Sequence, residues 1–301
     1  MAFSKLNLNY AESYQQALEQ QFPYVLYFGD LFATPNNGRY KWVDESTIKI
    51  PTVSTSGRVD GDRETIGTKK RNFNNSWTPL TVENHRTWST LVHPRDIDQT
   101  SGAVSIANIT QVYNNEQKFP EMNAYCVSKI YADWTGKSRT PDKTKLTEEN
   151  VLTVFDKMME KMDDKRVPRA GRILYVTPQT RTLINNAKTI YRTLDATTPQ
   201  AIKRAITAID EVKIPDSVPS DMMKTLYDFT EGWAVDGSAK QINMFLVHPL
   251  AVITPIHYEF AKLDPPSAGS DGKWVYFEES FEDVFALPTK LDAIDFNITE
   301  E

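Results

Sequence analysis

Apolar residues follow their longest regular pattern between residues 101 and 136. On both sides of Pro120 they recur every three or four positions, as on one face of an amphipathic helix. Proline is poorly tolerated inside a helix but suits its first turn, so the stretch predicts either one long kinked helix or two helices end to end. Such a helix must bury its stripe against a sheet or other helices. The stripe consists of Val104, Ile106, Ile109, Val112, Tyr113, Met122, Tyr125, Cys126, Ile130, Tyr131 and Trp134.

The N-terminal part of the chain predicts an arm. Residues 10–22 place Tyr14 and Leu18 on one helical face together with other apolar positions. A short amphipathic helix near a chain end either docks on its own domain or lies across a neighbour. Residues 24–32 are too apolar and aromatic for a free loop, and they predict a strand or a buried turn.

Residues 47–91 predict a hairpin that projects from the body of the protein. Residues 47–53 alternate apolar and polar positions, with Pro51 as on an edge strand, and residues 77–91 are rich in Thr, Val and Trp. Residues 54–75 between them are polar, turn-rich and nearly devoid of large apolar side chains. Because such a segment can bury little surface in a core, we expect it to stand out from the domain.

The second half of the chain predicts a compact α/β unit followed by strands. A charged linker at residues 137–145 precedes a helix that opens at Thr147, and residues 172–176 predict a buried strand. Thr177 and Pro178 then begin another helix, as cap and first-turn residue. The βα pattern continues loosely through residues 202–209 and 212–214, and further strands are predicted at residues 241–253, 273–287 and 293–298, with a turn at residues 265–272. The fold class is therefore α+β.

Composition limits what the 301-residue chain does. Its apolar and charged content is that of a folded soluble protein of one elaborate domain or two modest ones. A net charge of −6 argues against a dedicated nucleic-acid binder. No apolar run approaches the roughly 18 residues of a membrane span, and the N-terminus has no signal-peptide core. We therefore expect folding in a reducing cytoplasm, or in something assembled there.

Cys126 is the only cysteine in the sequence. This excludes an intramolecular disulfide and a multi-cysteine zinc site. Because Cys126 lies in the apolar stripe, we interpret it as a small buried hydrophobe and not as a reactive thiol.

Motifs for cofactor or metal chemistry are incomplete. Gly136, Lys137 and Ser138 imitate the end of a phosphate-binding loop, but Tyr131 stands where that motif needs a glycine. The acidic residues near Asp60 lack the spacing of a calcium-binding loop. The four histidines are scattered and form no metal-binding pair of known spacing. We expect no cofactor and no metal.

Glu278, Glu279, Glu282 and Asp283 form an acidic group within an alternating strand. Two carboxylates could serve a glycosidase, but spacing in the sequence does not give their separation in space. A polar strand face is the interpretation that we favour. No serine stands in a nucleophile elbow, so a carboxylate-dependent hydrolase relying on Glu278 or Glu282 is an alternative without further support.

The order of these elements resembles that of the major capsid proteins of tailed double-stranded DNA bacteriophages, with the Hong Kong 97-like fold. Residues 119–131 (FPEMNAYCVSKIY) are similar to a Pro-Glu-x-(Asp/Asn)-x-Tyr segment in the spine region of the family. Residues 167–178 (VPRAGRILYVTP) resemble a strand of its axial domain, and residues 247–255 and 274–287 resemble the strand after that domain and the return strand. The resemblance covers essentially the whole chain in order.

The resemblance implies a division of the chain into five parts. These are an N-terminal arm (1–40), an extended hairpin loop with peripheral-domain strands (41–98), a spine helix of the peripheral domain (99–146), an axial domain (147–254) and peripheral return strands (255–301).

The resemblance also implies a structural protein that assembles into the hexamers and pentamers of an icosahedral head enclosing double-stranded DNA. The protein would assemble in the host cytoplasm and reside in the virion. The partners implied are further copies of itself, a scaffolding protein, a portal protein, a decoration protein and weakly held DNA, with no membrane. Because no long extension precedes the arm, the chain resembles members that use a separate scaffolding protein.

Candidate contacts between subunits follow from the same resemblance. Lys69, Lys70 and Arg71 form the one concentrated basic patch of the hairpin, and Tyr14 and Leu18 lie on the apolar face of the arm. Two alternatives without catalysis stay open: an encapsulin-like compartment shell, and a head-decoration or receptor-binding module.

Overall fold

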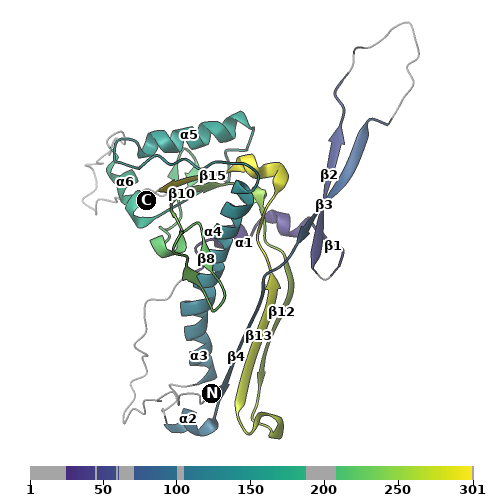
Figure 1. Cartoon of the computed structure of the whole chain (residues 1–301), viewed down its shortest axis with the longest axis vertical. Helices are drawn as coiled ribbons and strands as arrows, with labels where there is room; N and C mark the ends of the chain where they lie inside the picture. Colours follow the sequence, from purple (N-terminus) through teal and green to yellow (C-terminus); the bar gives the residue numbers. More distant parts are fainter. Residues whose placement is uncertain are drawn as a thin grey trace, which may run out of the picture.

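A long helix runs through the middle of the molecule, with a five-stranded sheet at one end, a three-stranded sheet beside it and a projecting hairpin (Figure 1). The structure, a computed structural model, describes residues 25–44, 46–58, 60, 71–99, 105–187 and 208–299. The helix predicted over residues 10–22, with Tyr14 and Leu18, lies outside the described residues, as do Lys69 and Lys70.

The long helix, here called the spine helix, comprises α3 (Ile106–Tyr113), a π-helical segment η2 (Asn114–Lys118) and α4 (Phe119–Thr135). The Ser105 side chain caps its start by accepting a hydrogen bond from the Asn108 backbone N–H at 3.3 Å. Of the two predicted alternatives, the structure has one long helix, and its interruption is a π-helical turn just before α4 and Pro120. Such a turn widens the helix where a proline ring would otherwise meet the carbonyl one turn earlier.

The five-stranded sheet has the order β15-β10-β5-β7-β6. Its strands are β5 (Ile173–Val176), β6 (Ala208–Ile209), β7 (Val212–Lys213), β10 (Gln241–Val247) and β15 (Ile294–Thr299). Strand β10 is antiparallel to both β5 and β15, and β5 is parallel to β7. The strands predicted at 172–176 and 293–298 are confirmed, and both pair with β10. The single strand predicted over 241–253 is wrong beyond Val247, because a short helix (Pro249–Ala251) interrupts it and Val252 and Ile253 pair in a different sheet.

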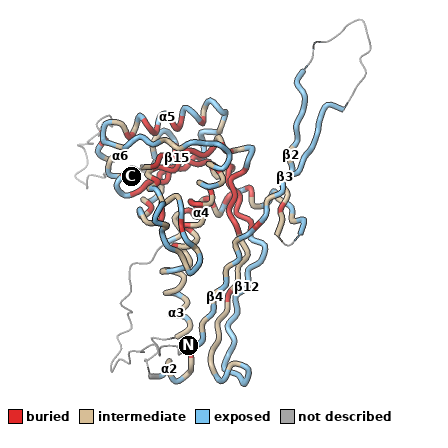
Figure 2. The backbone as a smooth tube through the Cα atoms, viewed as in Figure 1, coloured by how far each residue is buried: buried red, intermediate tan, exposed pale blue. Residues whose placement is uncertain are grey.

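Helices cover both faces of this sheet, which explains why its central strands are continuous apolar runs. Leu174 and Leu246 pack with α5 (Val151–Asp164) and α6 (Pro178–Asn186) on one face. Tyr175 and Phe245 point to the opposite face and pack with α4. Figure 2 shows the buried backbone concentrated in this layered region. The helix predicted from Thr147 begins four residues later, at Val151, after a hydrogen-bonded turn.

Aromatic rings form the centre of the core between the sheet and α4. The rings of Phe245 and Phe296 stack with centroids 4.6 Å apart, and Tyr131 and Trp134 meet Phe296 edge-on at 5.2 and 5.3 Å. The Trp134 indole donates a hydrogen bond to the Leu291 carbonyl at 3.2 Å, so its polar atom is satisfied in the core. Cys126 is fully buried, as predicted.

A three-stranded antiparallel sheet with the order β12-β13-β4 lies along the spine helix (Figure 1). It contains β4 (His85–Val92), β12 (Ile256–Asp264) and β13 (Trp274–Glu282). Residues 265–273, with the short helix η5 (Ala268–Ser270), turn the chain from β12 into β13, as the proline-rich and glycine-rich turn predicted.

The projecting hairpin consists of β2 (Thr47–Thr55) and β3 (Phe73–Thr81), joined at its base by β1 (Lys41–Trp42). Nine residue pairs connect β2 and β3, from Thr47 opposite Thr81 to Thr55 opposite Phe73. The prediction of a hairpin is confirmed, but the predicted single arm over residues 77–91 is wrong. Val82 is buried at the base, and the chain then enters β4 in a different sheet, so the strand-like run is divided between two sheets.

Short elements connect these parts. Residues 24–32 were predicted as a strand or a buried turn; the described residues 25–32 form a turn and α1 (Gly29–Phe32), with Phe28 and Leu31 fully buried. The other short elements are η1 (Pro35–Gly38), α2 (Pro94–Gln99), η3 (Ser220–Met222), β8 (Tyr227–Asp228), β9 (Ala234–Val235), η4 (Pro249–Ala251), β11 (Val252–Ile253), β14 (Phe285–Ala286) and η6 (Pro288–Ala293). Within the described ranges, no helix is both long and apolar enough to cross a membrane.

The division into five parts stays a prediction. Strand β15, which belongs to the segment expected to return to the spine helix, pairs with β10 of the expected axial domain. The five-stranded sheet therefore contains strands from both sides of the expected boundary at residue 254.

Candidate assembly interface

The outer half of the hairpin exposes apolar side chains on both strands. The exposed fractions are 68% for Val53, 53% for Phe73 and 47% for Trp77. Arg71, one of the predicted contact residues, lies just before β3, with its guanidinium 4.7 Å from the centre of the Phe73 ring. Apolar side chains that stay exposed to water contribute no burial to the stability of a monomer. The hairpin therefore has the properties of a surface that is covered in an assembly.

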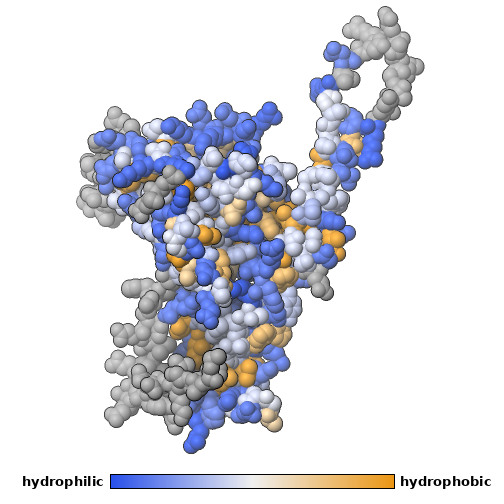
Figure 3. Space-filling view, viewed as in Figure 1, coloured by the Kyte–Doolittle hydropathy of each residue, from blue (hydrophilic) through white to orange (hydrophobic). Residues whose placement is uncertain are grey.

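The base of the hairpin is held firmly in the body. Ile48 and Val82 are buried in a cluster with Ile253, Phe285 and Leu287. Figure 3 shows hydrophobic residues gathered on the surface where the hairpin joins the body. The Glu83 backbone N–H also donates to the Asp283 carboxylate at 3.0 Å. The hairpin therefore projects in a defined direction from a packed base.

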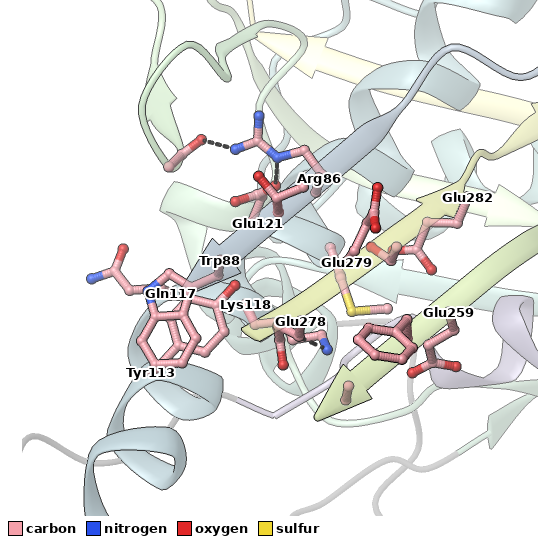
Figure 4. Close-up of a pocket in the computed structure, with 16 residues that line it drawn as sticks. Arg86, Trp88, Tyr113, Gln117, Lys118, Glu121, Glu259, Glu278, Glu279 and Glu282 are labelled. Atoms are coloured by element: carbon pink, nitrogen blue, oxygen red, sulfur yellow. Dashed lines mark hydrogen bonds and ion pairs between the residues drawn. The ribbon is translucent and has the colours of Figure 1, made fainter. Parts of the chain in front are cut away.

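A pocket of about 300 Å³ lies between the spine helix and the three-stranded sheet (Figure 4). The rings of Trp88 on β4 and Tyr113 on α3 stack there with centroids 3.8 Å apart. The acidic residues that line the pocket are Glu121, Glu259, Glu278, Glu279 and Glu282.

Arg86 connects three elements at this pocket. Its Nε lies 2.5 Å from Glu121 Oε1 on α4, and its other two nitrogens donate to the carbonyls of Phe229 and Gly232 at 2.8 and 3.3 Å. Figure 4 shows the Arg86 guanidinium beside the Glu121 carboxylate. A planar guanidinium with several donors suits this role better than an ammonium group would.

Glu278 is nearly buried and has several polar partners, among them the Tyr113 hydroxyl. The Lys118 ammonium lies 3.2 Å from its carboxylate, and the Tyr276 hydroxyl donates to it at 2.9 Å. Burial and this hydrogen bond raise the pKa of Tyr276 to about 12, so its hydroxyl keeps its proton at neutral pH. The contact with Lys118 attaches β13 to the spine helix, whereas the hydrogen bond from Tyr276 lies within β13.

The other three acids of the predicted polar face have separate environments. Glu279 points to the opposite face of the sheet and pairs with His85 at 2.6 Å. Asp283 accepts a hydrogen bond from the Tyr125 hydroxyl at 2.8 Å. Burial, with the charges of Glu259 and Glu121, raises the pKa of Glu282, against the lowering effect of Lys118.

The acidic group is therefore mainly structural: it is divided between two faces, and three of its members serve as hydrogen-bond or ion-pair partners. Among the described residues, no group of three histidine, cysteine or acidic side chains is arranged to hold a metal ion. Burial raises the pKa of the Cys126 thiol, which keeps it protonated and unreactive.

Sequence reasoning did not find Arg86, Glu121 or the Trp88–Tyr113 stack. Each pair joins residues that are far apart in the sequence. Glu121 belongs to the family-like segment 119–131 and Tyr113 to the apolar stripe, but neither pattern indicates a partner on β4. The only available signal was the alternation of residues 85–91, which places Arg86 and Trp88 on the same face of a strand.

Comparison with solved structures identifies the fold. The chain is similar to the mature capsid of bacteriophage PhiM1, with a TM-score of 0.68 and 12% identity over 97% of this chain and 92% of that one. It is similar to the capsid of the cyanophage P-SCSP1u, with a TM-score of 0.65 and 12% identity over 97% and 93% of the two chains. It also resembles the capsid of a native GTA particle, with a TM-score of 0.58 and 10% identity over 97% and 95%.

The chain therefore has the mixed helix-and-sheet fold of phage capsid proteins, as the order of its predicted elements indicated. No protein-family model matches the sequence. No curated protein matches it either. The likeness thus lies in the three-dimensional arrangement and not in residue identity.

Proposed function

We propose that this protein is the major capsid protein of a tailed double-stranded DNA phage. Copies of it would assemble into the hexamers and pentamers of an icosahedral head. The observation that carries the proposal is the hairpin, which extends beyond any core of its own subunit and exposes Val53, Phe73 and Trp77 at its outer half. The chain has the fold of phage capsid proteins, and in an assembled shell a neighbouring copy would cover these exposed side chains.

Symmetry makes such a hairpin effective. In a closed shell every subunit repeats the same contact, so a modest apolar contact per hairpin becomes a large total stabilisation. The basic group at residues 69–71 would meet acidic surface on the adjoining subunit, and Tyr14 and Leu18 of the arm would lie across a neighbour. The subunit itself carries a net charge of −6, which suits loose contact with packaged DNA.

The remaining parts of the proposal follow from a capsid role. The shell would assemble in the host cytoplasm, with a scaffolding protein and a portal protein, and the mature protein would reside in the virion. A decoration protein is a further partner of such shells. The five-part division into arm, extended hairpin loop, spine helix, axial domain and return strands would then describe the regions that meet at different symmetry axes.

Deletion of residues 54–75 with a short glycine-containing turn in their place tests the proposal. We expect a folded subunit with the circular dichroism spectrum of the native protein, because every residue of this segment that the structure describes is exposed. The variant should form no closed shells under conditions in which the unaltered chain does. Normal particles from the deletion variant would overturn the assigned role of the hairpin.

Two other functions make different predictions. An encapsulin-like compartment would form similar shells but enclose a protein cargo in place of DNA, so the content of purified particles distinguishes the two. A carboxylate-dependent hydrolase is favoured only by the raised pKa of Glu282 beside the other acids of the pocket. It would be a monomer or small oligomer whose activity on glycoside substrates disappears in Glu282→Gln.

A further inference from the structure

Two cationic side chains lie close together near the base of the hairpin. Arg39 stands two residues before β1, and Lys290 belongs to η6. Neither forms an ion pair with any residue that the structure describes. Arg86, Arg139 and Arg172, by contrast, each pair with a carboxylate of their own subunit. The two cations are therefore without the partner that other arginines of the chain have.

A buried asparagine links the two cations. Arg39 Nη1 lies 3.5 Å from Asn36 Oδ1, and the Asn36 amide nitrogen donates to the Leu250 carbonyl at 2.7 Å. The Lys290 ammonium donates to the same carbonyl at 2.9 Å. The Asn36 amide nitrogen also lies 3.1 Å from the Val252 carbonyl, so the body of the subunit holds the link in place. One side-chain amide and one carbonyl oxygen thus separate the guanidinium from the ammonium group.

Two like charges held this close repel each other. Partial burial, and then the charge of Arg39, lower the pKa of Lys290 below its ordinary value. Because no described carboxylate lies within ion-pair distance of either group, nothing near them offsets the repulsion. The pair of cations therefore destabilises the isolated subunit, and an anion placed against both would remove that effect.

A carboxylate of a second copy has the chemistry that this pair accepts. The planar guanidinium presents several N–H donors in the geometry that a carboxylate matches, and the ammonium adds a second positive charge. The chain contains 40 acidic residues against 34 lysines and arginines, so a neighbouring copy has carboxylates to offer. Arg39 also directly precedes the hairpin, whose exposed apolar side chains we assign to contacts between copies.

We propose that Arg39 and Lys290 together bind a carboxylate of a neighbouring copy of this chain. The inference rests on the proposed self-assembly, since the second copy supplies the anion. In the shell the carboxylate neutralises the repulsion between the two cations, whereas in the free subunit the repulsion remains. Removing one cation should therefore weaken the shell without weakening the subunit. A cation that serves only its own fold would do the reverse.

Arg39→Gln tests this separation of the two effects. The melting temperature of the unassembled variant should equal that of the unaltered chain or exceed it, and the particle yield in electron microscopy should fall several-fold. Arg139→Gln is the matched control, because Arg139 is exposed and pairs with Asp292 of its own subunit. Its particle yield should be unchanged. An undiminished yield from Arg39→Gln, or a melting temperature lower by several degrees, would overturn the inference.

Zero-length carbodiimide cross-linking tests the contact itself, because the reagent joins an amine to a carboxylate that touches it. Unlabelled and isotope-labelled chains are assembled together, cross-linked, digested and analysed by mass spectrometry. We expect Lys290 joined to an acidic residue of a differently labelled copy in particles, and no such product from unassembled subunits. A Lys290 product only within one chain, or none in samples that contain particles, would overturn the inference while the capsid proposal stands.

Packaged DNA is the other anion that could meet the two cations. In that case Arg39→Gln would lower the yield of filled particles but not of shells assembled without DNA, and this result would also overturn the inference. We expect the same several-fold loss for empty shells. Absence of particles from the unaltered chain would contradict the capsid proposal itself.

Discussion

Replacing Arg86 with alanine should loosen the three-stranded sheet from the spine helix. The Arg86 guanidinium pairs with Glu121 on α4 and donates to the carbonyls of Phe229 and Gly232. Alanine removes all three contacts at once. It also leaves Glu121 without its cation in a pocket that already contains Glu278 and other acids.

The size of the effect follows from burial. The side chains of Arg86 and Glu121 are 31% and 19% exposed. Their pair therefore lies between a fully exposed pair, which contributes up to about 1 kcal/mol, and a buried one, whose disruption costs about 3–5 kcal/mol. With two further charge-assisted hydrogen bonds lost, we expect Arg86→Ala to lower the free energy of unfolding by about 2–4 kcal/mol at pH 7.

Urea denaturation of the unassembled subunit, followed by tryptophan fluorescence, measures this loss. Arg139→Ala is the matched control, because Arg139 pairs with Asp292 at 2.7 Å while the two side chains are 42% and 34% exposed. That variant should lose less than about 1 kcal/mol. A double-mutant cycle of Arg86→Ala with Glu121→Gln should show coupling. If Arg86→Ala were no more destabilising than Arg139→Ala, the assignment of Arg86 as the link would be refuted.

Three further predictions concern single side chains. Burial and neighbouring acids raise the pKa of Glu282 in the folded state above its value in the unfolded state. Ionisation of Glu282 therefore destabilises the fold as the pH rises from the unfolded-state pKa through the folded-state pKa. Glu282→Gln should therefore raise the melting temperature at pH 7 but not at pH 4, and a lower value at pH 7 would contradict this. The Tyr175 hydroxyl oxygen is buried without a hydrogen-bond partner among the described residues. In urea denaturation, Tyr175→Phe should therefore leave the free energy of unfolding unchanged or raise it by up to about 1 kcal/mol. A loss of more than about 1 kcal/mol would show that the hydroxyl is hydrogen-bonded. Trp77→Ser should leave the melting temperature of the subunit unchanged and lower the particle yield in microscopy, whereas an undiminished yield would exclude Trp77 from the contact.

Elements with a local signal were predicted from the sequence. The helix predicted after Thr147 is α5, whose Val151, Phe155 and Met158 are buried, and Thr177 caps α6 by accepting a hydrogen bond from the Thr180 backbone. The long helix and the hairpin were predicted for the same reason. In each case periodicity, caps and turn residues are contained in a single stretch of chain.

Features that depend on distant residues were not predicted. The division of residues 77–91 between two sheets is decided by the pairing of β4 with β13, nearly 200 residues away. The π-helical segment before Pro120 needed the three-dimensional path of the helix. The Arg86–Glu121 pair and the Trp88–Tyr113 stack join β4 to the spine helix, and no sequence pattern connects their members. The buried role of Cys126, by contrast, follows from its place in a local stripe.

Electron microscopy of the expressed full-length chain, alone and together with its scaffolding protein, tests the central claim most directly. The proposed function predicts closed, round particles in which hexamers and pentamers are resolved by averaging. A monomer or small oligomer under both conditions, at concentrations where capsid subunits assemble, would contradict it.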